Sequence, residues 1–450
     1  MRRKIVTLLL ILGFLTSSSV LSCLPVQAKS RTILVPDDYP TITAAIANSI
    51  DGDIIFVKKG TYEEPINQTL IINKSISLIG ENVYETKLIL HPPLIPIVMF
   101  PDTRLMVHDY GIKIETNQAS LVSLTITSDG NGISVSGDAA VLTGNRLNMG
   151  VNIEADCVQI ISNTMTFITV SGDNNTVAHN NLSNPNPGNG FISCKGSYNT
   201  IANNTILGYT SAASNVDGRF NVFYGNTIEK GGIGIKGDDN IIGKNNITGG
   251  EGTGNIYLEK GSNNMVFANR IINGAGLGVG VGYNNSFFAN EMVSNSVGFI
   301  IGDSKVNTLH HNNFIGNTYQ VWTGKGANGT VSFDNGHEGN YWSDYSGFDA
   351  NGDGIGDTPK QVYASYYGDQ DVLSNILLGQ DNFPLMTPFD IDSVTVQLPD
   401  WVILSLNSEP ETNESESSEP IPALPVAAAS VATAIVVGAV LLLYFKKRKR

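Results

Sequence analysis

The sequence predicts an all-β solenoid, a parallel β-helix in which a coil of short strands repeats along one axis. The first observation is the phrase N-x-(I/V/F/L)-x-x-N-x-(I/L/M/F), which recurs with a mean period of about 21 residues and is clearest in residues 137–317. The second is that the apolar residues of each copy are mostly β-branched or aromatic and lie two or five positions apart, which is strand spacing. A coil of this length is the size of one rung, so equivalent residues should stack about 4.8 Å apart.

The second asparagine of the phrase is predicted to point into the solenoid. It lies three residues after an apolar residue in every copy, as Asn180 follows Val177. Stacked asparagine amides can hydrogen-bond from rung to rung, whereas an asparagine that only marks a turn needs no such constant offset. The predicted structural ladder consists of Asn145, Asn163, Asn180, Asn204, Asn226, Asn245, Asn269, Asn290 and Asn312.

Residues 32–80 are expected to open the solenoid. Residues 39–50 begin with a turn and continue as a short helix whose apolar face contains Ile42, Ala45 and Ile46. Because a solenoid needs a cover over its first coil, this helix is predicted to be an N-terminal cap. Prolines between residues 88 and 107 remove ladder donors, which predicts a protruding loop or distorted coil.

Both ends of the chain carry targeting signals. Residues 1–28 have the cationic start, apolar run and small-residue end of a secretory signal peptide. The sequence Val20-Leu-Ser-Cys23 also resembles a bacterial lipoprotein box, so lipidation of Cys23 stays open. Residues 426–445 form an uncharged segment long enough for a transmembrane helix, and the cations of residues 446–450 predict a basic cytoplasmic tail.

Two short segments are predicted between the terminal module and the transmembrane helix. Residues 391–406 are expected to form a short β extension, and residues 407–425, rich in Glu, Ser and Pro, a disordered stalk. Together with the targeting signals, they predict a single-pass protein of the cell membrane whose N-terminal part is extracellular.

Composition limits the partners. The formal net charge is −14, and no basic stripe of the kind that binds nucleic acid is visible. An acidic exterior favours cations or neutral glycans, so polysaccharides or surface glycans are the expected partners. Cys157 and Cys194 fall in different coils at different offsets, which predicts two buried thiols and no disulfide.

Nine N-x-S/T sequons lie outside the signal peptide, and none of their asparagines belongs to the predicted ladder. This separation fits ladder side chains that point inward and sequons that lie on turns. The candidate glycosylation sites are Asn67, Asn73, Asn174, Asn181, Asn203, Asn246, Asn284, Asn328 and Asn413.

Several motifs carry a resemblance to a known family. The series Pro40-Thr-Ile, Gly52-Asp-x-Ile-x-Val, Gly60-Thr-Tyr and Ile76-Ser-Leu-Ile-Gly resembles the start of right-handed parallel β-helix proteins of the pectate-lyase type. More closely, it resembles the NosD-like group with its carbohydrate-binding and sugar-hydrolysis repeats. The stretches GNYWSDY (339–345) and DNFPLM (381–386) are similar to the terminal module of archaeal NosD-like surface proteins.

The resemblance covers most of residues 32–388. It implies a right-handed parallel β-helix over residues 32–335 and a C-terminal NosD-like module over residues 336–390.

The best candidate for a metal site is an Asp-rich loop in the terminal module. Asp349, Asn351, Asp353 and Asp357 place oxygen side chains at alternate positions around glycines, which is how short loops wrap a hard cation such as Ca²⁺. The glutamate expected at position twelve is replaced by Lys360, so another ligand, for which Asp344 is a candidate, must complete the shell. A solvated Asp-Gly turn is the alternative.

Copper is implied by the NosD resemblance, but the sequence does not favour it. Copper wants clustered His, Cys or Met, and the six histidines are scattered, with only His310 and His311 adjacent. In a strand these two would point to opposite faces, so they are not expected to chelate together.

The sequence also contains little evidence for a catalytic site. Asp238-Asp239 superficially resembles the acidic pair of β-helix polygalacturonases, but it lies in a turn, as Asp173 does. A lyase needs a base with cations around a uronate, and Lys236, Lys244, Lys260 and Arg270 form no readable set. No catalytic residue is therefore assigned, and the protein is expected not to be an enzyme.

The predicted function is glycan or matrix binding, adhesion or cell-envelope structure by a membrane-anchored extracellular β-helix. One alternative is a polysaccharide lyase or glycoside hydrolase. The other is a copper accessory protein like those of the NosD group.

Overall fold

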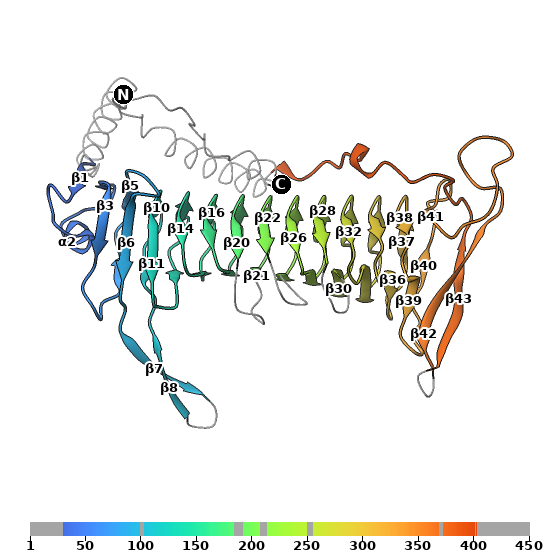
Figure 1. Cartoon of the computed structure of the whole chain (residues 1–450), viewed down its shortest axis with the longest axis horizontal. Coiled ribbons are helices and arrows are strands. Elements are labelled where there is room, and N and C mark those ends of the chain that lie inside the picture. Colours follow the sequence, from blue (N-terminus) through green and yellow to red (C-terminus); the bar gives the residue numbers. More distant parts are fainter. Residues whose placement is uncertain are drawn as a thin grey trace, which may run out of the picture. The chain divides into compact units, whose positions relative to one another are not determined.

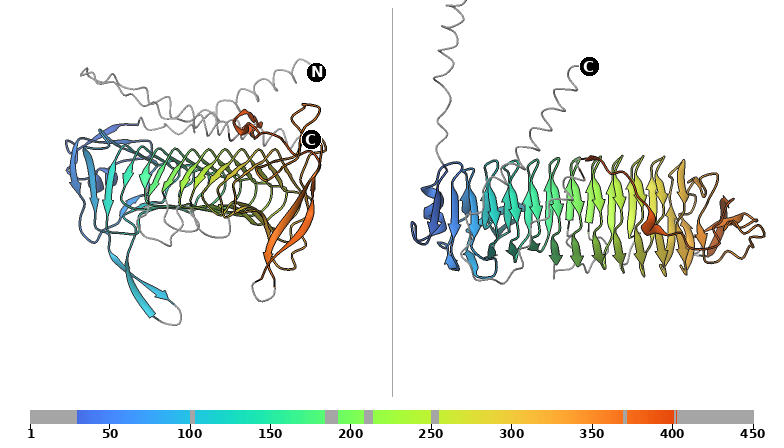
Figure 2. Two further views of the ribbon diagram at one scale, coloured as in Figure 1. Left: turned by 45° about the vertical axis from the view of Figure 1, so that its right-hand side comes forward. Right: turned by 90° about the horizontal axis from the view of Figure 1, so that it is seen from above.

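The chain folds into a right-handed parallel β-solenoid of about 12 turns with almost no helix, so the predicted all-β solenoid is confirmed (Figure 1). The computed structural model describes residues 30–99, 103–183, 192–207, 214–249, 255–368, 372–400 and 402. The coils supply strands to three long sheets, here called sheets A, B and C, which run side by side along the axis (Figure 2).

Sheet A has 14 strands, all parallel. They are β1 (Thr32–Val35), β2 (Ile54–Val57), β5 (Ser77–Gly80), β10 (Ser120–Val122), β13 (Val141–Thr143), β16 (Gln159–Ile161), β19 (Thr176–Ala178), β22 (Thr200–Ala202), β25 (Val222–Tyr224), β28 (Ile241–Gly243), β31 (Met265–Phe267), β34 (Ser286–Phe288), β37 (Asn307–His310) and β40 (Val331–Ser332).

Sheet B has 13 parallel strands. They are β3 (Gly60–Glu63), β6 (Thr86–Leu90), β11 (Thr125–Ser128), β14 (Arg146–Leu147), β17 (Thr164–Met165), β20 (Asn181–Ser183), β23 (Thr205–Leu207), β26 (Thr227–Glu229), β29 (Asn246–Thr248), β32 (Arg270–Ile272), β35 (Glu291–Val293), β38 (Asn313–Ile315) and β41 (Tyr341–Trp342).

Sheet C has 14 strands and ends in an antiparallel pair, β42 with β43. Its strands are β4 (Leu70–Ile72), β9 (Ile112–Ile114), β12 (Ile133–Val135), β15 (Val151–Ile153), β18 (Ile168–Ser171), β21 (Ile192–Lys195), β24 (Ser214–Asp217), β27 (Ile233–Lys236), β30 (Ile256–Lys260), β33 (Leu277–Val281), β36 (Val297–Ile301), β39 (Tyr319–Thr323), β42 (Lys360–Tyr367) and β43 (Leu373–Asp381).

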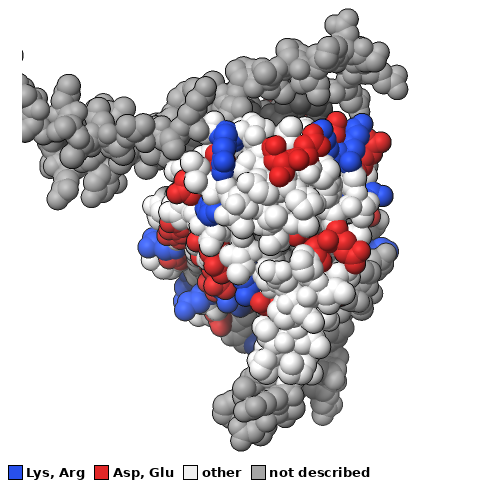
Figure 3. Space-filling model, turned by 90° about the vertical axis from the view of Figure 1, so that its left-hand side faces the viewer, with Lys and Arg blue, Asp and Glu red and all other residues white. Residues whose placement is uncertain are grey.

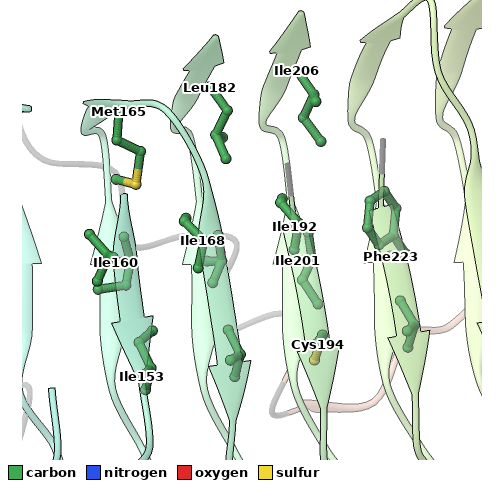
Figure 4. Close-up of a cluster of buried hydrophobic side chains, with 14 of the residues drawn as sticks. Ile153, Ile160, Met165, Ile168, Leu182, Ile192, Cys194, Ile201, Ile206 and Phe223 are labelled. Atoms are coloured by element: carbon green, nitrogen blue, oxygen red, sulfur yellow. The ribbon is translucent and has the colours of Figure 1, made fainter. Parts of the chain in front are cut away.

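The core consists of inward side chains that stack in rows from coil to coil. Ile160, Ile201 and Phe223 belong to one row of sheet A, and Leu182 and Ile206 to a row of sheet B (Figure 4). All five are buried. Since burial of one such side chain contributes about 1.5–3 kcal/mol, the stacked rows supply the main stabilisation of the fold.

A continuous column of buried asparagines lies at the turn between sheets A and B. It contains the nine asparagines named from the repeat, each donating its backbone N–H and its Nδ2 to Oδ1 of the asparagine in the next coil. From Asn204 to Asn226 the two distances are 2.9 and 3.0 Å. Asn340 extends the column and donates its backbone N–H to the buried carboxylate of Asp381 at 2.7 Å.

A second asparagine column lies at the turn between sheets C and A. Its members are the first asparagines of successive copies of the repeat phrase: Asn175, Asn199, Asn221, Asn240, Asn264, Asn285 and Asn307. Glycines precede these turns because there is no space for a side chain. A Cβ on Gly237, whose φ is 128°, would lie 1.9 Å from the carbonyl oxygen of Gly218.

The short helix α2 (Ile42–Ala47) packs on the first coils. Its Ile42, Ala45 and Ile46 are buried and belong to the main core. Glu64 accepts the first N–H groups of the helix, at 2.9 and 3.2 Å. At the other end the ammonium of Lys74 donates to three carbonyl groups, at 2.8, 2.9 and 2.8 Å. Both ends of the helix are therefore bonded to the solenoid.

An antiparallel hairpin projects from the solenoid between β6 and β9 (Figure 1). Its strands are β7 (Leu94–Met99) and β8 (Thr103–His108), so the protrusion expected between residues 88 and 107 is a paired hairpin. Leu94, Leu105 and Met106 are exposed. The hairpin is the lobe that projects downwards in Figure 3. On the face visible there, its described part shows no charged side chain.

Residues 336–390 do not break away from the solenoid as a separate module would. Their strands β41 and β42 extend sheets B and C, and Asn340 extends the asparagine column. Sheets B and C therefore run past the boundary that the sequence suggested at residue 335.

Residues 389–400 and 402, here called the strap, begin beside sheet B and continue over the outer face of sheet A. Phe389 and the side chain of Asn313 exchange two hydrogen bonds, at 2.7 and 2.8 Å. Further along, Leu398 and Val402 join outward residues of sheet A, including Val222 and Phe267, in a second apolar cluster. The strap holds a 3-10 turn, η2 (Ile391–Ser393), and none of its described residues forms the short β extension expected there.

The predicted signal peptide, Cys23, the stalk with Asn413, the transmembrane segment and the basic tail lie outside the described residues. Within the part of the chain that is described, no helix has the length and apolar character needed to cross a membrane.

Candidate functional site

The outer face of sheet C changes from polar to aromatic along the axis. Successive Cα partners form one outward row, and its central and C-terminal members are Ser134, Asn152, Thr169, Ser193, Asn215, Gly234, Tyr257, Gly278, Ile300, Trp322 and Ser365. A Cβ on Gly278 would lie 2.9 Å from the ring of Tyr257 and 2.9 Å from Ile300, so the neighbouring side chains fill the place of a missing one. The row thus offers hydroxyl and amide groups first and ring surfaces later.

Trp322 is the centre of an aromatic group at the end of this row. Its ring centroid is 5.1 Å from that of Tyr319 and 5.1 Å from that of Tyr367, at interplanar angles of 59° and 66°. Tyr367 is 55% exposed and Trp322 is half-buried. Such rings combine an apolar face with a polar edge, which is the chemistry that a sugar ring, apolar on its faces and hydroxylated at its edge, can use.

A hollow of about 550 Å³ opens beside the aromatic group. Ser365, the partner of Trp322 in the outward row, lies in its wall, so the row leads into the hollow. Apart from Val362, the other lining side chains are polar or aromatic: Asn317, Thr318, Tyr319, Gln320, Trp342, Asp344, Lys360, Gln361, Tyr363 and Asn375. Eight of its twelve lining residues are polar and three are aromatic, so the hollow offers mainly hydrogen-bonding groups, with rings beside them.

A bonded network holds the polar groups of the hollow in place. Lys360 Nζ donates to Asp344 Oδ2 at 2.9 Å and lies 5.7 Å from the ring centre of Trp342. Gln320 Nε2 donates to the other oxygen of Asp344 at 3.4 Å, and its Oε1 accepts from Asn317 at 3.1 Å. A cation, a carboxylate and two amides are therefore oriented before any ligand arrives.

A charged row runs next to the outward row on sheet C. Lys195, Asp217, Lys236 and Lys260 are successive Cα partners, so Lys236 and Lys260, which looked unrelated in the sequence, share one row. Lys236 pairs with Glu259 at 2.9 Å. This hydrogen bond raises the pKa of Lys236, whereas a lysine acting as a base needs a lowered pKa.

Asp238 and Asp239, the acidic pair of the sequence, are used in the turn. Asp238 Oδ1 accepts the N–H of Ser262 at 2.9 Å, and Asp239 binds Arg219 at 2.8 Å. The same Arg219 lies 3.8 Å from Asp238. Because both carboxylates share one guanidinium, the pair does not offer the separate acid and base of a glycoside hydrolase. Lys244 lies in a turn with φ of 54° and Arg270 on sheet B, away from this pair.

The Asp-rich loop folds onto its own backbone. Asp349 accepts the N–H groups of Gly352 and Gly354 at 2.6 and 2.8 Å, and these bonds lower its pKa. Asp353 accepts from Ile355 at 2.9 Å, and Asp357 from Ala350 at 2.7 Å. Asn351 accepts from Asp353 and donates to its carboxylate. Asp344, the suggested extra ligand, pairs with Lys360 instead.

His310 and His311 lie side by side, so the expectation that they point to opposite faces is wrong. Their Nδ1 atoms are 3.0 Å apart, because His311 has a φ of 58° and the strand alternation ends before it. Burial, together with His311, lowers the pKa of His310 to about 4. His311 Nε2 bonds to Glu338 at 2.6 Å.

Cysteine placement also differs from the expectation of two buried thiols. Cys194 is buried, but Cys157 is exposed, because it lies at a turn with a φ of 60°. Both are free.

Residues 213–347 match a family described as "Periplasmic copper-binding protein (NosD)", which confirms the resemblance to the NosD-like group over that segment. No curated protein sequence matches the chain.

Solved structures with a similar course include a PL6 family alginate lyase, AlyGC, with 13% identity and a TM-score of 0.47 over 82% of this chain. They also include PfbA, a surface adhesin of Streptococcus pneumoniae, with 10% identity and a TM-score of 0.46, over 74% of this chain and 93% of the adhesin. A GH87 α-1,3-glucanase from Streptomyces thermodiastaticus has 14% identity and a TM-score of 0.45, over 70% of each chain. This chain spans 58% of the length of the alginate lyase.

The side chains of the described region do not fit the copper that the family description names. In that region, no group of three or more His, Cys, Asp or Glu side chains is placed to hold a metal ion. The closest approach to a copper pair is His310 with His311, and the far nitrogen of His311 is taken by Glu338.

Sequence reasoning missed the aromatic group and the hollow. The hollow joins residues 317–320, 342–344 and 360–375, which come from three different passes of the chain. Trp322 could have been found, because it lies in the last copy of a coil whose earlier copies fix which strand positions point outward.

Proposed function

We propose that this chain is an extracellular, membrane-anchored scaffold that binds a glycan chain along the outer face of sheet C, in adhesion or in the structure of the cell envelope. The observation that carries the proposal is the outward row that passes from hydroxyl and amide groups to Trp322 and then, through Ser365, into the terminal hollow. An extended polymer matches this arrangement because its sugars can contact successive coils. The orientation of Asp344 and Lys360 in the hollow supports recognition of sugar hydroxyl groups.

The anchor and the extracellular location are part of the proposal. They rest on the sequences of residues 1–28 and 426–450. We also propose that α2 covers the open end of the first coil, which is supported by its three buried side chains and by the bonds at both of its ends.

Calcium binding by Asp349, Asn351, Asp353 and Asp357 completes the proposal. It is supported by the four oxygen-bearing side chains on this turn, which must move together to hold the cation, because no group of the described acidic side chains is already placed to do so. Binding requires Asp349 to exchange backbone N–H groups for the cation, so we expect a measurable shift of the loop when Ca²⁺ is added. Nuclear magnetic resonance of the loop amides during a Ca²⁺ titration tests this, and unchanged amide signals at millimolar Ca²⁺ contradict it.

The test of glycan binding is a panel of neutral and uronic-acid polysaccharides measured against the natural chain and two variants. Trp322→Ala removes the central ring, and we expect at least a tenfold weaker affinity, equivalent to about 1.4 kcal/mol. Tyr283→Ala is the matched control, because Tyr283 is 60% exposed in the turn between sheets C and A, outside the outward row. Equal affinities for both variants would contradict the proposed face. Shortening of a polysaccharide during the assay would instead identify a lyase or hydrolase.

A further inference from the structure

The sequon asparagines and the ladder asparagines occupy opposite environments. Eight of the nine sequons lie in the described residues, and all eight asparagine side chains are exposed. All nine ladder asparagines are buried. A transferase that modifies an asparagine must reach its amide nitrogen, so the structure leaves every described sequon available.

The eight exposed sequons avoid one face of the solenoid. Asn181 and Asn246 point outward from sheet B, in one row. Asn203 lies in a turn between sheets A and B, and Asn174 and Asn284 lie in turns between sheets C and A. The remaining three lie in connections before or after a strand of sheet C. None of the eight lies on the outward row of sheet C.

Asparagines do occur on sheet C, but without the hydroxyl residue that makes a sequon. Asn152 and Asn215 are both in its outward row, and the residues two positions later are Glu154 and Asp217. On sheet B, the residues two positions after Asn181 and Asn246 are Ser183 and Thr248. Equivalent surface positions therefore carry the acceptor signal on sheet B and lack it on sheet C.

Asn313 shows the same separation on sheet B. Its side chain is occupied by two hydrogen bonds to Phe389 of the strap, and Ile315 stands where a sequon needs a hydroxyl. On sheet B, the sequons thus follow the asparagines that remain open and not the one that is covered.

We propose that the eight described sequon asparagines carry N-linked oligosaccharides, and that this coat covers sheet B and the turns while the outer face of sheet C stays bare for its ligand. The second half rests on the proposed glycan-binding function. In the modification, the amide nitrogen of asparagine loses a proton and attacks the anomeric carbon of an oligosaccharide carried on a lipid phosphate. The bond from that carbon to the phosphate oxygen breaks, and the lipid phosphate leaves with the electron pair and takes up the proton.

The coat is tested on the full chain isolated from its natural host. Mass spectrometry of its peptides should show oligosaccharide on the eight asparagines and none on Asn152 or Asn215. Hydroxyl-radical footprinting before and after enzymatic removal of the sugars then maps the covered surface. We expect Tyr198 and Tyr283, which lie beside the turns of Asn174 and Asn284, to react at least twofold faster after removal. Tyr257 and Trp322 on sheet C should not change.

Two added sequons connect the coat to ligand binding. Asp217→Thr creates a sequon at Asn215 on sheet C, and Thr164→Asn creates one on sheet B, beside Asn181. Once mass spectrometry shows sugar at both new positions, the Asp217→Thr protein should bind its panel polysaccharide at least tenfold more weakly, and the Thr164→Asn protein within twofold of the natural chain.

The two proposals fail in different ways. Unmodified asparagines, or faster oxidation of Trp322 after sugar removal, would overturn the coat whatever the chain binds. If the natural chain binds no polysaccharide of the panel, the proposed function fails, while occupancy and footprinting still decide the coat.

Discussion

At the scale of single residues, the asparagine column works because an amide has two donor hydrogens and an oxygen that accepts twice. In Asn245 one hydrogen goes to Asn269 and the other to the carbonyl of Phe223, at 2.9 and 3.0 Å. Its oxygen accepts two bonds from Asn226, each 3.0 Å long. The column therefore buries a polar atom in every coil without leaving it unpaired, and this explains why the repeat requires asparagine and not merely a polar residue.

Asn245 and Asn246 provide a matched pair of substitutions. Asn245→Ala leaves the backbone N–H of Asn226 without an acceptor, whereas Nδ2 of Asn226 keeps its bonds to the carbonyl groups of Ile201 and Tyr224. We therefore expect a loss of about 1–3 kcal/mol, the cost of one unsatisfied buried donor. Asn246→Ala removes an exposed side chain, and a change within about 0.5 kcal/mol is expected. Denaturant unfolding of both proteins measures the difference. Similar midpoints would show that the column is not a source of stability.

Asp381 ends the column with a carboxylate, which accepts hydrogen bonds and has no N–H to donate. Burial raises its pKa above the ordinary value of 3.8, and bonds such as that from Trp342 Nε1 at 2.8 Å act in the opposite sense. Between the ordinary and the raised pKa, the unfolded chain has released its proton and the folded chain has not. The unfolded state then binds fewer protons, so stability is highest below the ordinary pKa and falls as pH rises through this window.

Asp381→Asn should remove that part of the pH dependence. The measurement is thermal unfolding of the natural and substituted chains between pH 3 and pH 7. Between the two pKa values, the difference in their free energies of unfolding is expected to change by up to about 1.4 kcal/mol for each pH unit. The substituted chain also loses the bond from Phe383 N–H, at 3.1 Å, which gives a constant offset. Parallel curves across the whole range would contradict the raised pKa.

At the scale of elements, short strands alternate with turns whose residues have a positive φ. This explains two errors of sequence reasoning, because His311 and Cys157 were read as strand or core positions and lie instead in turns with φ of 58° and 60°. The strand periods predict which residues point inward. They fail where a strand ends, since a left-handed residue resets the direction of the next side chain.

The strap is an element whose docking can be tested by one residue. Leu398 is buried against sheet A, while its neighbour Gln397 is exposed. Leu398→Asp places a charge in this apolar cluster, which costs several kcal/mol. We expect the strap to detach and to be cut by protease at least tenfold faster, with little change in the unfolding of the coils. Gln397→Asp is the control and should be cut at the natural rate. Equal cutting of both would mean that the strap is not held by its apolar contacts.

At the scale of the whole molecule, the period predicted the solenoid because each coil repeats the same contacts with its two neighbours. The hollow and the strap could not be predicted in this way. Each depends on residues far apart in the chain, as when Ser365 meets Trp322 or Phe389 meets Asn313. No repeated phrase records such single contacts, so they appear only once the coils are stacked.

Removal of one whole coil tests this modularity. Thr227 and Asn246 are Cα partners, so deletion of residues 227–245 joins equivalent positions of adjacent coils. The stability of a solenoid is close to a sum of contributions from contacts between neighbouring coils. We therefore expect a folded, shorter solenoid whose circular dichroism spectrum, expressed as mean-residue ellipticity, is unchanged. Deletion of residues 227–236 removes half a coil and should prevent folding. Loss of structure in both deletions would contradict the modular description.

The strap also determines where mechanical tension enters the protein. The chain leaves the last coil near Phe389 and ends its described course at Val402, against strands in the middle of sheet A. A pull on the chain beyond residue 402 therefore acts first on the apolar contacts of Leu398 and Val402, and only after these yield does it reach the hydrogen bonds of the last coil. Under force the strap therefore detaches and extends first, while the hydrogen bonds between the coils remain intact.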